Sequence, residues 1–177
     1  KKGSRSALVG PFADSLWDLI GSWVHFAEAG RTSTFLDGLR ARFGADRVTY
    51  ARGCDPHKAL EGGVSEAVAA AAKSDVVLVA LGLKAGESGE AASLASLALP
   101  DAQRDLLESL KQTGKPIVVL LVTGRPMELA REAELADALL LTWYQGTMAG
   151  EALADVVSGD YNPSGGLPMT FPRTGGQ

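Results

Sequence analysis

The sequence predicts an α/β fold, a three-layer sandwich in which a mostly parallel sheet of five to six strands is covered by helices on both faces. The first observation behind this prediction is the alternation of short strand-like stretches with stretches of helical spacing along the chain. The second is that residues 75–81, 116–122 and 138–143 are apolar almost throughout. Strands of that kind are typical of a parallel sheet that is buried on both faces.

The first half of the chain contains three predicted strands and two predicted helices. Residues 6–9 form a short apolar strand that ends at a Gly-Pro pair, and residues 47–50 form a second short strand. Residues 34–43 have apolar side chains at helical spacing, which predicts a helix. Residues 64–73 are rich in Ala and favour a helix, after which residues 75–81 form the third strand.

The second half repeats the same alternation. The helix predicted at residues 100–112 has Pro100 near its first turn, and Asp101 adds the negative charge that the N-terminus of a helix favours. Gly114 is expected to end this helix. The remaining predicted elements, in chain order, are a strand at 116–122, a helix at 126–133, a strand at 138–143, a helix at 150–157 and a Gly- and Pro-rich tail at 158–177.

Length and composition indicate one domain that spans residues 1–177. The 177 residues are 46% hydrophobic and 21% charged, which suffices for a sizeable core. Because the formal net charge is −4 and no apolar stretch reaches the roughly 20 residues of a membrane span, we predict neither a nucleic-acid partner nor a membrane partner. Because the chain begins with Lys1 rather than Met, we expect a processed product, a fragment or an engineered piece of a protein.

Cysteine and histidine are scarce, so the sequence predicts no metal site and no cofactor. Cys54 is the single cysteine, which excludes an internal disulfide and a Cys-based zinc site, and the two histidines are His25 and His57. A Cys54–His57 thiol–imidazole pair is conceivable, but a packed thiol beside a surface histidine is the more common arrangement. His25 lies among apolar residues and is expected to be half-buried. The common nucleotide-binding and serine-hydrolase motifs are absent.

The stretch "GLKAGESGEAASLASLAL", residues 82–99, is the main candidate for a functional loop. It follows the predicted strand 75–81, and in sheets of this kind sites form at the carboxyl ends of the strands. It is longer than the connections of about 2–6 residues that are usual in such domains. Because it carries Glu87 and Glu90, a solvated acidic loop and half of an active site are both compatible with it.

Sugar chemistry is the natural use of such a carboxyl group. Glycoside hydrolysis needs a carboxylic acid that protonates the departing oxygen and a second carboxylate on the other side of the sugar ring. An acid on a long loop can reach a cleft shared with a neighbouring domain, where its pKa rises once water is excluded. Trp143 ends the predicted strand 138–143 at the same edge, where an aromatic ring can stack on a sugar, although tryptophan is more often a core residue.

Six stretches of the chain together resemble one known family. They are "ALVGPFADS", "GSW", "SDVVLVALG", "GEAAS", "LALPDAQRDLLESLKQTGKPIVVLLVTGRPMEL" and "ADALLLTWYQGTMAGEALADVVSGDYNPSGGLPMTFPRTGGQ", and they are spread in the family's order over the 177 residues. On these motifs the chain resembles the α/β-sandwich domain, which is the second domain, of glycoside hydrolase family 3, especially its bacterial β-glucosidase branch.

The resemblance implies a part of a retaining glycosidase that uses two carboxylates from two domains. The family's nucleophilic Asp lies on a TIM-barrel-like domain that nothing in these residues resembles, and its general acid/base is a Glu on the long loop of the second domain. The matching position is Glu90, with Glu87 as the runner-up because the length of this loop varies in the family. The isolated chain is then expected to be inactive or nearly so.

The resemblance also implies the surroundings of such a domain. Its expected partners are the TIM-barrel-like domain, either in the same polypeptide or as a separate chain, and a β-glucoside substrate. No cofactor is implied. Relatives in the family are often periplasmic or secreted, which is the localisation that the resemblance suggests.

The chain departs from the family pattern at four positions. Leu94 stands where the family usually has Arg, Met148 where it has an acidic residue, Ser158 where it has an aromatic residue, and Gly166 where it has Lys or Arg. These differences support an alternative function, a stand-alone or engineered α/β domain without catalysis that binds sugar weakly or serves as a scaffold. On this alternative, the positions changed because a stand-alone domain exposes them to solvent. Burial of Leu94, Met148 and Ser158 deep in the core would contradict that explanation.

Overall fold

Five parallel strands form one sheet in the computed structural model, which describes residues 3–176. The strands are β1 Ser6–Val9, β2 Val48–Ala51, β3 Val76–Gly82, β4 Ile117–Val122 and β5 Ala138–Leu141. Their order in the sheet is β2-β1-β3-β4-β5, and every neighbouring pair is parallel. The predicted α/β class is therefore confirmed, with five strands from the predicted five to six.

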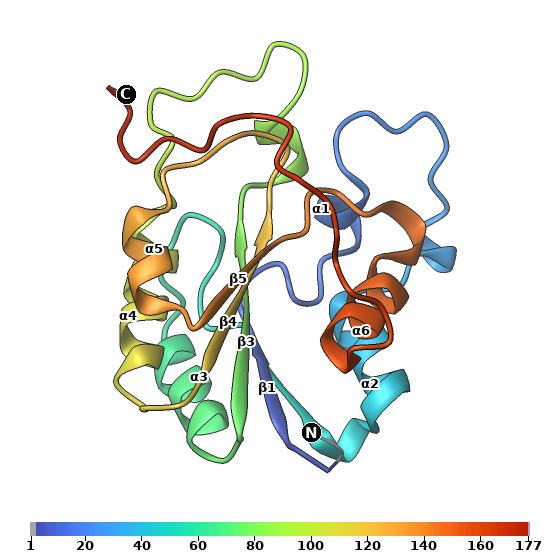
Figure 1. Ribbon diagram of the computed structural model, residues 1–177, viewed down its shortest axis with the longest axis vertical. Coiled ribbons are helices and arrows are strands. Elements are labelled where there is room, and N and C mark those ends of the chain that lie inside the picture. Colours follow the sequence, from blue (N-terminus) through green and yellow to red (C-terminus); the bar gives the residue numbers. More distant parts are fainter. Residues whose placement is uncertain (1–2, 177) are drawn as a thin grey trace.

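Helices cover both faces of the sheet, so the predicted three-layer arrangement is confirmed (Figure 1). The helices are α1 Leu16–Ile20, α2 Phe35–Phe43, α3 Gly63–Ala72, α4 Asp101–Lys111, α5 Ala130–Leu135 and α6 Ala149–Ser158. α3, α4 and α5 lie on one face, and α1, α2 and α6 lie on the other.

Alternate residues of each central strand pack into the two layers of the core. In β3, Val77, Val79 and Leu81 lie in the core layer that contains the buried side chains of α3 and α4. Leu78 and Ala80 lie in the opposite layer, with the buried side chains of α2 and α6. All five side chains are 2% exposed or less. Because both faces of the strand are covered, it has no polar face, which explains its continuously apolar sequence.

The predicted helix at residues 34–43 is confirmed as α2, and its first turn shows why it begins there. The Thr34 hydroxyl accepts a hydrogen bond from the Asp37 amide at 3.1 Å, and the Asp37 carboxylate accepts one from the Thr34 amide at 3.0 Å. This reciprocal arrangement satisfies two amides that the helix itself leaves unpaired. The apolar side chains of α2 then reach the core, including Phe35 and Leu39.

The helix predicted at residues 126–133 begins later, at Ala130, so this boundary is wrong. The Glu128 amide donates to the Leu97 carbonyl at 2.9 Å, and Glu128 forms an isolated parallel bridge with Ala98. These contacts hold the residues before α5 alongside the connection between β3 and α4. The parallel bridge needs extended backbone at Glu128, so the helix begins only after it, and the pairing involves residues that are distant in sequence.

The strand predicted at residues 138–143 ends at Leu141, and one short helix is new. The backbone of Trp143 enters the left-handed region with φ of 54°, which turns the chain away from the sheet. The new helix is α1, whose five residues are too few to show a helical period in the sequence.

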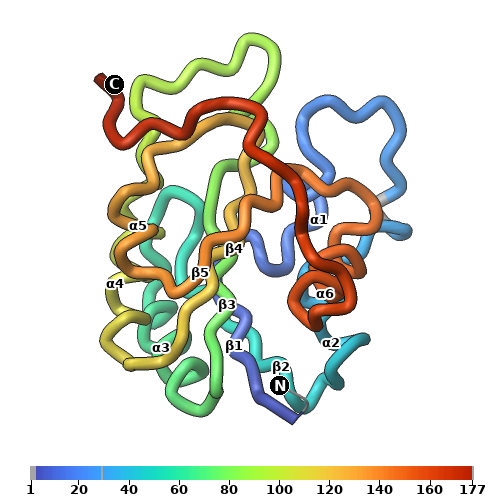
Figure 2. Tube along the Cα trace, in the orientation of Figure 1, coloured from blue at the N-terminus to red at the C-terminus, as the bar shows by residue number. Residues whose placement is uncertain are grey.

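The carboxyl ends of the strands lie together at one edge of the sheet, which is at the top in Figure 1. The strand order reverses between β1 and β3, which is where sheets of this kind form their sites. The connection after β3 rises above this edge, and the tail after α6 passes over it (Figure 2). Within residues 3–176, no helix has the length and the apolar character needed to cross a bilayer.

Candidate active-site loop

The acid loop, which we define as residues 83–99, follows the carboxyl end of β3 and leads to α4. It therefore starts beside the point where the strand order reverses (Figure 1). A short 3₁₀ helix, η3 Ala85–Glu87, forms its first part. The loop carries both of the carboxylates that the sequence marks as catalytic candidates, and the structure gives them different surroundings.

Glu90 presents a free carboxylate to solvent. The residue is exposed, and among residues 3–176 its side chain has no hydrogen-bond or ion-pair partner. The neighbouring Gly89 and Ala91 have φ values of 133° and 60°, so the backbone turns sharply on both sides of Glu90. A positive φ at Ala91 costs roughly 1–3 kcal/mol, and strain of this kind is concentrated at functional sites.

Glu87, in contrast, is bound into the structure of the loop. One carboxylate oxygen accepts a hydrogen bond from the Lys84 amide at 2.8 Å. The other, Oε1, lies 2.8 Å from Nε2 of His57, which belongs to the connection after β2. The Glu87 side chain is only 18% exposed. Both of its oxygens are therefore engaged, which leaves Glu90 as the carboxylate of this loop that is free to act on a ligand.

Three polar side chains from other segments also hold the acid loop. Each comes from the same edge of the sheet. Asp18, in α1 after β1, accepts a hydrogen bond from the Ala85 amide at 2.9 Å. Arg125, after β4, donates to the Ala92 carbonyl at 2.9 Å, and the hydroxyl of Tyr144, after β5, donates to the Lys84 carbonyl at 3.2 Å. The sequence analysis did not identify these residues. Their positions shortly after predicted strands could have indicated them, because sites form at the carboxyl ends of the strands.

The Tyr144 hydroxyl is suited to this donor role. Burial raises the pKa of Tyr144, and the nearby negative charges of Asp18 and Glu87 act in the same direction. The phenol therefore stays protonated and keeps its proton for the Lys84 carbonyl at neutral pH.

His57 meets Glu87 rather than Cys54. Cys54 is fully buried, and no hydrogen bond between the two side chains is present in the part of the chain that the structure describes. The thiol therefore has the packed, structural environment that was the more common of the two expected arrangements. His25 differs from expectation, because it is exposed instead of half-buried.

Cys54 should be unreactive in the folded protein. Burial and then the negative charge of Asp55 raise the pKa of Cys54 to about 11, so at about pH 8 very little thiolate is present. We expect a disulfide-type thiol reagent at this pH to label Cys54 only after unfolding in urea, and labelling of the folded protein to accelerate as the pH approaches the thiol pKa. Immediate stoichiometric labelling of the folded chain would contradict this.

Trp143 lies at the same edge and packs against the tail. Its ring centroid is 6.0 Å from that of Phe171, with an interplanar angle of 65°, which is an edge-to-face contact. Both residues are partly buried. The left-handed backbone of Trp143 is unusual for a bulky residue and is the second strained position near the acid loop, after Ala91.

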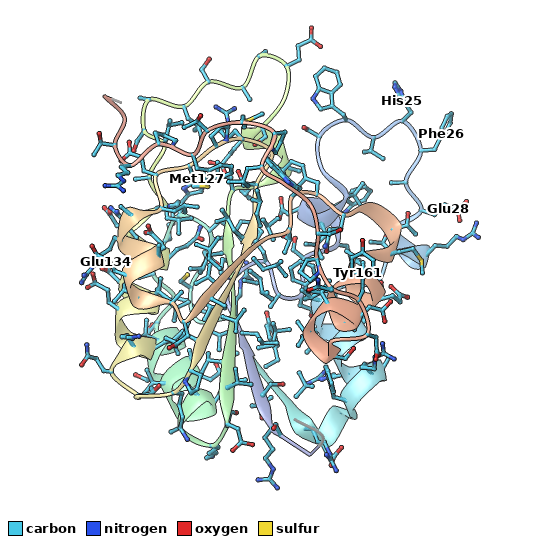
Figure 3. All side chains as sticks on the ribbon, viewed as in Figure 1. His25, Phe26, Glu28, Met127, Glu134 and Tyr161 are labelled. Atoms are coloured by element: carbon cyan, nitrogen blue, oxygen red, sulfur yellow. The ribbon has the colours of Figure 1, made fainter. Side chains whose placement is uncertain are left out.

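Large apolar side chains are exposed in α1 and in the connection that follows it. Trp17 is 60% exposed, Trp23 is 74% exposed and Phe26 is 97% exposed. A Cβ built on Gly89 would lie 3.4 Å from Nε1 of Trp23, so the segment that carries these aromatic residues lies against the turn before Glu90. Figure 3 shows Phe26, together with His25, pointing away from the body of the domain.

The positions that depart from the family pattern are not deep in the core. Leu94 is partly buried and packs against the core layer of α3 and α4. Met148 is 57% exposed. Ser158 is partly buried and donates a hydrogen bond to Asp160 at 2.9 Å. The burial that would contradict adaptation to solvent is therefore not found, and that adaptation stays a hypothesis.

A family model matches the whole chain. The model describes the glycosyl hydrolase family 3 C-terminal domain, and the match covers residues 1–177. The periplasmic β-glucosidase of Salmonella typhimurium is 41% identical over an alignment of 199 residues, which covers 100% of this chain and 26% of that protein. A β-xylosidase of Formosa agariphila is 42% identical over 143 residues, which covers 80% of this chain and 20% of that protein.

Solved structures show the same similarity. The crystal structure of a β-glucosidase from Listeria innocua in complex with isofagomine has a TM-score of 0.93 and 41% identity, over 99% of this chain and 24% of that one. A β-glucosidase from Erythrobacter marinus has a TM-score of 0.83 and 31% identity, over 97% of this chain and 26% of that one. The chain thus spans about a quarter of the length of these relatives.

Proposed function

Because the chain belongs to the glycosyl hydrolase family 3 C-terminal domains, we propose that residues 1–177 are one domain of a retaining β-glucosidase-like enzyme and that Glu90 is its general acid/base. The substrate is a β-glucoside, and the nucleophilic carboxylate belongs to a TIM-barrel-like domain in the same polypeptide or in a separate chain. The length of the relatives supports this, since each of them has about three quarters of its chain outside the matched region.

The observation that carries the proposal is the contrast between the two carboxylates of the acid loop. Glu90 is exposed and free, whereas Glu87 has both oxygens engaged. In a retaining mechanism the acid first protonates the departing glycosidic oxygen, and the same group then takes a proton from the water that hydrolyses the glycosyl-enzyme intermediate. Such a group must be able to approach a sugar oxygen, and Glu90 satisfies that requirement.

The exposed aromatic residues favour the interpretation of this chain as one domain of a larger enzyme over its interpretation as a stand-alone module. Trp17, Trp23 and Phe26 are each at least 60% exposed, and their segment adjoins the acid loop. Trp23 lies beside the turn before Glu90, and exposed apolar surface beside a candidate site supports a surface that another molecule or domain covers. We therefore place the cleft, and the TIM-barrel-like partner on its other side, at this edge of the sheet.

Trp143 is a proposed contact to the sugar. It follows the carboxyl end of β5 at the same edge, and its strained backbone is of the kind that persists at binding sites. The edge-to-face contact with Phe171 would hold the ring in a fixed orientation.

Substitution of Glu90 by Gln in the full-length enzyme should slow the hydrolysis of substrates with poor leaving groups by about 100-fold or more, because these substrates need the proton. Substrates with good leaving groups, such as nitrophenyl glucosides, should lose far less in the glycosylation step. The measurement is kcat/KM over a series of aryl glucosides with increasing leaving-group pKa. A steeper dependence on leaving-group pKa than in the unmodified enzyme is the expected result.

Two controls accompany this experiment. Glu134→Gln, an exposed change on α5 away from the acid loop (Figure 3), should leave the series unchanged. The isolated 177-residue chain should hydrolyse none of the substrates above background, since one carboxylate supports neither a retaining nor an inverting mechanism. Equal losses for all leaving groups in Glu90→Gln, or robust turnover by the isolated chain, would overturn the proposal.

A further inference from the structure

The acid loop is held on both sides of Glu90 but not at Glu90 itself. The contacts of Asp18, Tyr144 and Arg125 reach the backbone of residues 84, 85 and 92. Between them the chain turns at two positive φ values, and the Glu90 side chain extends into solvent. The position of its carboxylate therefore depends on how firmly the residues just before the turn are held.

Two residues just before this turn have side-chain contacts to other segments: Ser88, which is buried against Gly124 and Tyr144, and Glu87. The Oε2 of Glu87 accepts from the Lys84 amide at 2.8 Å, which closes η3, and its Oε1 lies 2.8 Å from Nε2 of His57. The Glu87 side chain is 18% exposed and that of His57 is 46% exposed, so water screens this pair only in part. The pair joins the acid loop to the connection after β2.

The connection that carries His57 is itself attached to the end of β3. The Pro56 carbonyl accepts a hydrogen bond from Nε2 of Gln103 at 2.7 Å. The same amide group of Gln103 bonds to the backbone of Gly82, with its oxygen 2.8 Å from the Gly82 nitrogen and its nitrogen 2.9 Å from the Gly82 oxygen. Because Gln103 is fully buried, this arrangement fixes His57 relative to the strand from which the acid loop starts.

We propose that His57 and Glu87 are a positioning pair, which fixes the acid loop so that the carboxyl group of Glu90 meets the glycosidic oxygen. This inference rests on the proposed function of Glu90 and gives the other carboxylate of the loop a separate role. The physical reason is that proton transfer requires a heavy-atom distance of about 2.6–3.2 Å, and an error of about 1 Å in placement can cost 100-fold in rate.

Replacement of His57 by Ala in the full-length enzyme should lower kcat for substrates with poor leaving groups by about 10- to 100-fold. KM should change little, and substrates with good leaving groups should be much less affected, because only the proton transfer is misplaced. His57→Gln, which keeps a nitrogen donor for Glu87, should recover part of the loss. Lys58→Ala, an exposed change in the same connection, is the matched control and should resemble the unmodified enzyme.

The double variant His57→Ala/Glu87→Ala tests whether the two side chains act together. Glu87→Ala also removes the contact with the Lys84 amide, so, if the two side chains form one unit, the double variant should lose no more activity than Glu87→Ala alone. Losses that multiply would overturn the pairing. Losses that do not depend on the leaving group would overturn the positioning role even if Glu90→Gln behaves as proposed.

Hydrogen exchange in the 177-residue chain gives a readout that does not depend on catalysis. In His57→Ala, the amides of Lys84 and Glu87, which donate within η3, should exchange faster than in the unmodified chain and in Lys58→Ala. The amides of β3 should keep their exchange rates. Unchanged exchange at Lys84 and Glu87 would show that His57 does not hold the loop, and would overturn the inference while leaving the assignment of Glu90 intact.

Discussion

Replacement of Gln103 by Leu should lower the free energy of unfolding by roughly 2–6 kcal/mol, because two buried backbone groups and one partly buried group lose their partner at once. The Gln103 side chain is fully buried and bonds to the Gly82 nitrogen, the Gly82 oxygen and the Pro56 oxygen. Leu has a similar volume but can replace none of these hydrogen bonds. Each unsatisfied group costs about 1–3 kcal/mol, which is large against a typical total stability of about 5–15 kcal/mol.

Urea unfolding of the 177-residue chain, followed by circular dichroism, measures this loss. Gln112→Leu is the matched control, because Gln112 is exposed at the end of the same helix, α4, and should change the stability by less than about 0.5 kcal/mol. If Gln103→Leu were no more destabilising than this control, water or a shifted side chain would have to satisfy the Gly82 and Pro56 groups.

The second large effect is expected at Gly38, where Ala should destabilise the domain by about 3 kcal/mol. Helix propensity alone predicts the opposite, since Ala is favoured over Gly inside a helix by about 1 kcal/mol. A Cβ on Gly38, however, would lie 2.0 Å from the Gly150 oxygen, and a Cβ on Gly150 would lie 2.2 Å from the Thr34 oxygen. Helices α2 and α6 therefore touch through their backbones, and a methyl group would force them apart and loosen the core between them.

Gly30→Ala is the control for Gly38→Ala. A Cβ on Gly30 would meet nothing within 4 Å, so this variant should stay within about 0.5 kcal/mol of the unmodified chain in the same urea experiment. The prediction for Gly38 rests on the close contact between the backbones of α2 and α6, and not on the conformational freedom of glycine. A stabilised Gly38→Ala variant would mean that the two helices lie farther apart in solution.

Much of the fold was predictable because its signals are local. Strand β3 is apolar along its length since both of its faces are buried, and α2 carries its N-terminal cap in Thr34 and Asp37. Each of these features depends on residues that are close in sequence. Helix α1 and the start of α5 were not predictable in this way, because α1 is very short and α5 is delayed by pairing between Glu128 and Leu97.

The candidate site was predictable as a region but not as an arrangement. The long connection after β3, with Glu87 and Glu90, is visible in the sequence, and the direction of parallel strands places it at the edge where sites form. The family motifs include Gln103 but say nothing about its bonds to Gly82 and Pro56. Without the partners of each carboxylate, the sequence ranks Glu90 above Glu87 only by resemblance.

The sequence by itself determined the class of fold, the family and the loop that carries the proposed acid, because these follow from hydrophobic pattern and motif order along the chain. Only the tertiary structure decided that Glu87 is engaged by His57 and Lys84 while Glu90 is free, and that Gly38 must have no side chain. The physical reason is that hydrogen bonds and close backbone contacts of this kind join segments that the fold alone brings together, and their energies depend on distances of a few ångströms that no local pattern encodes.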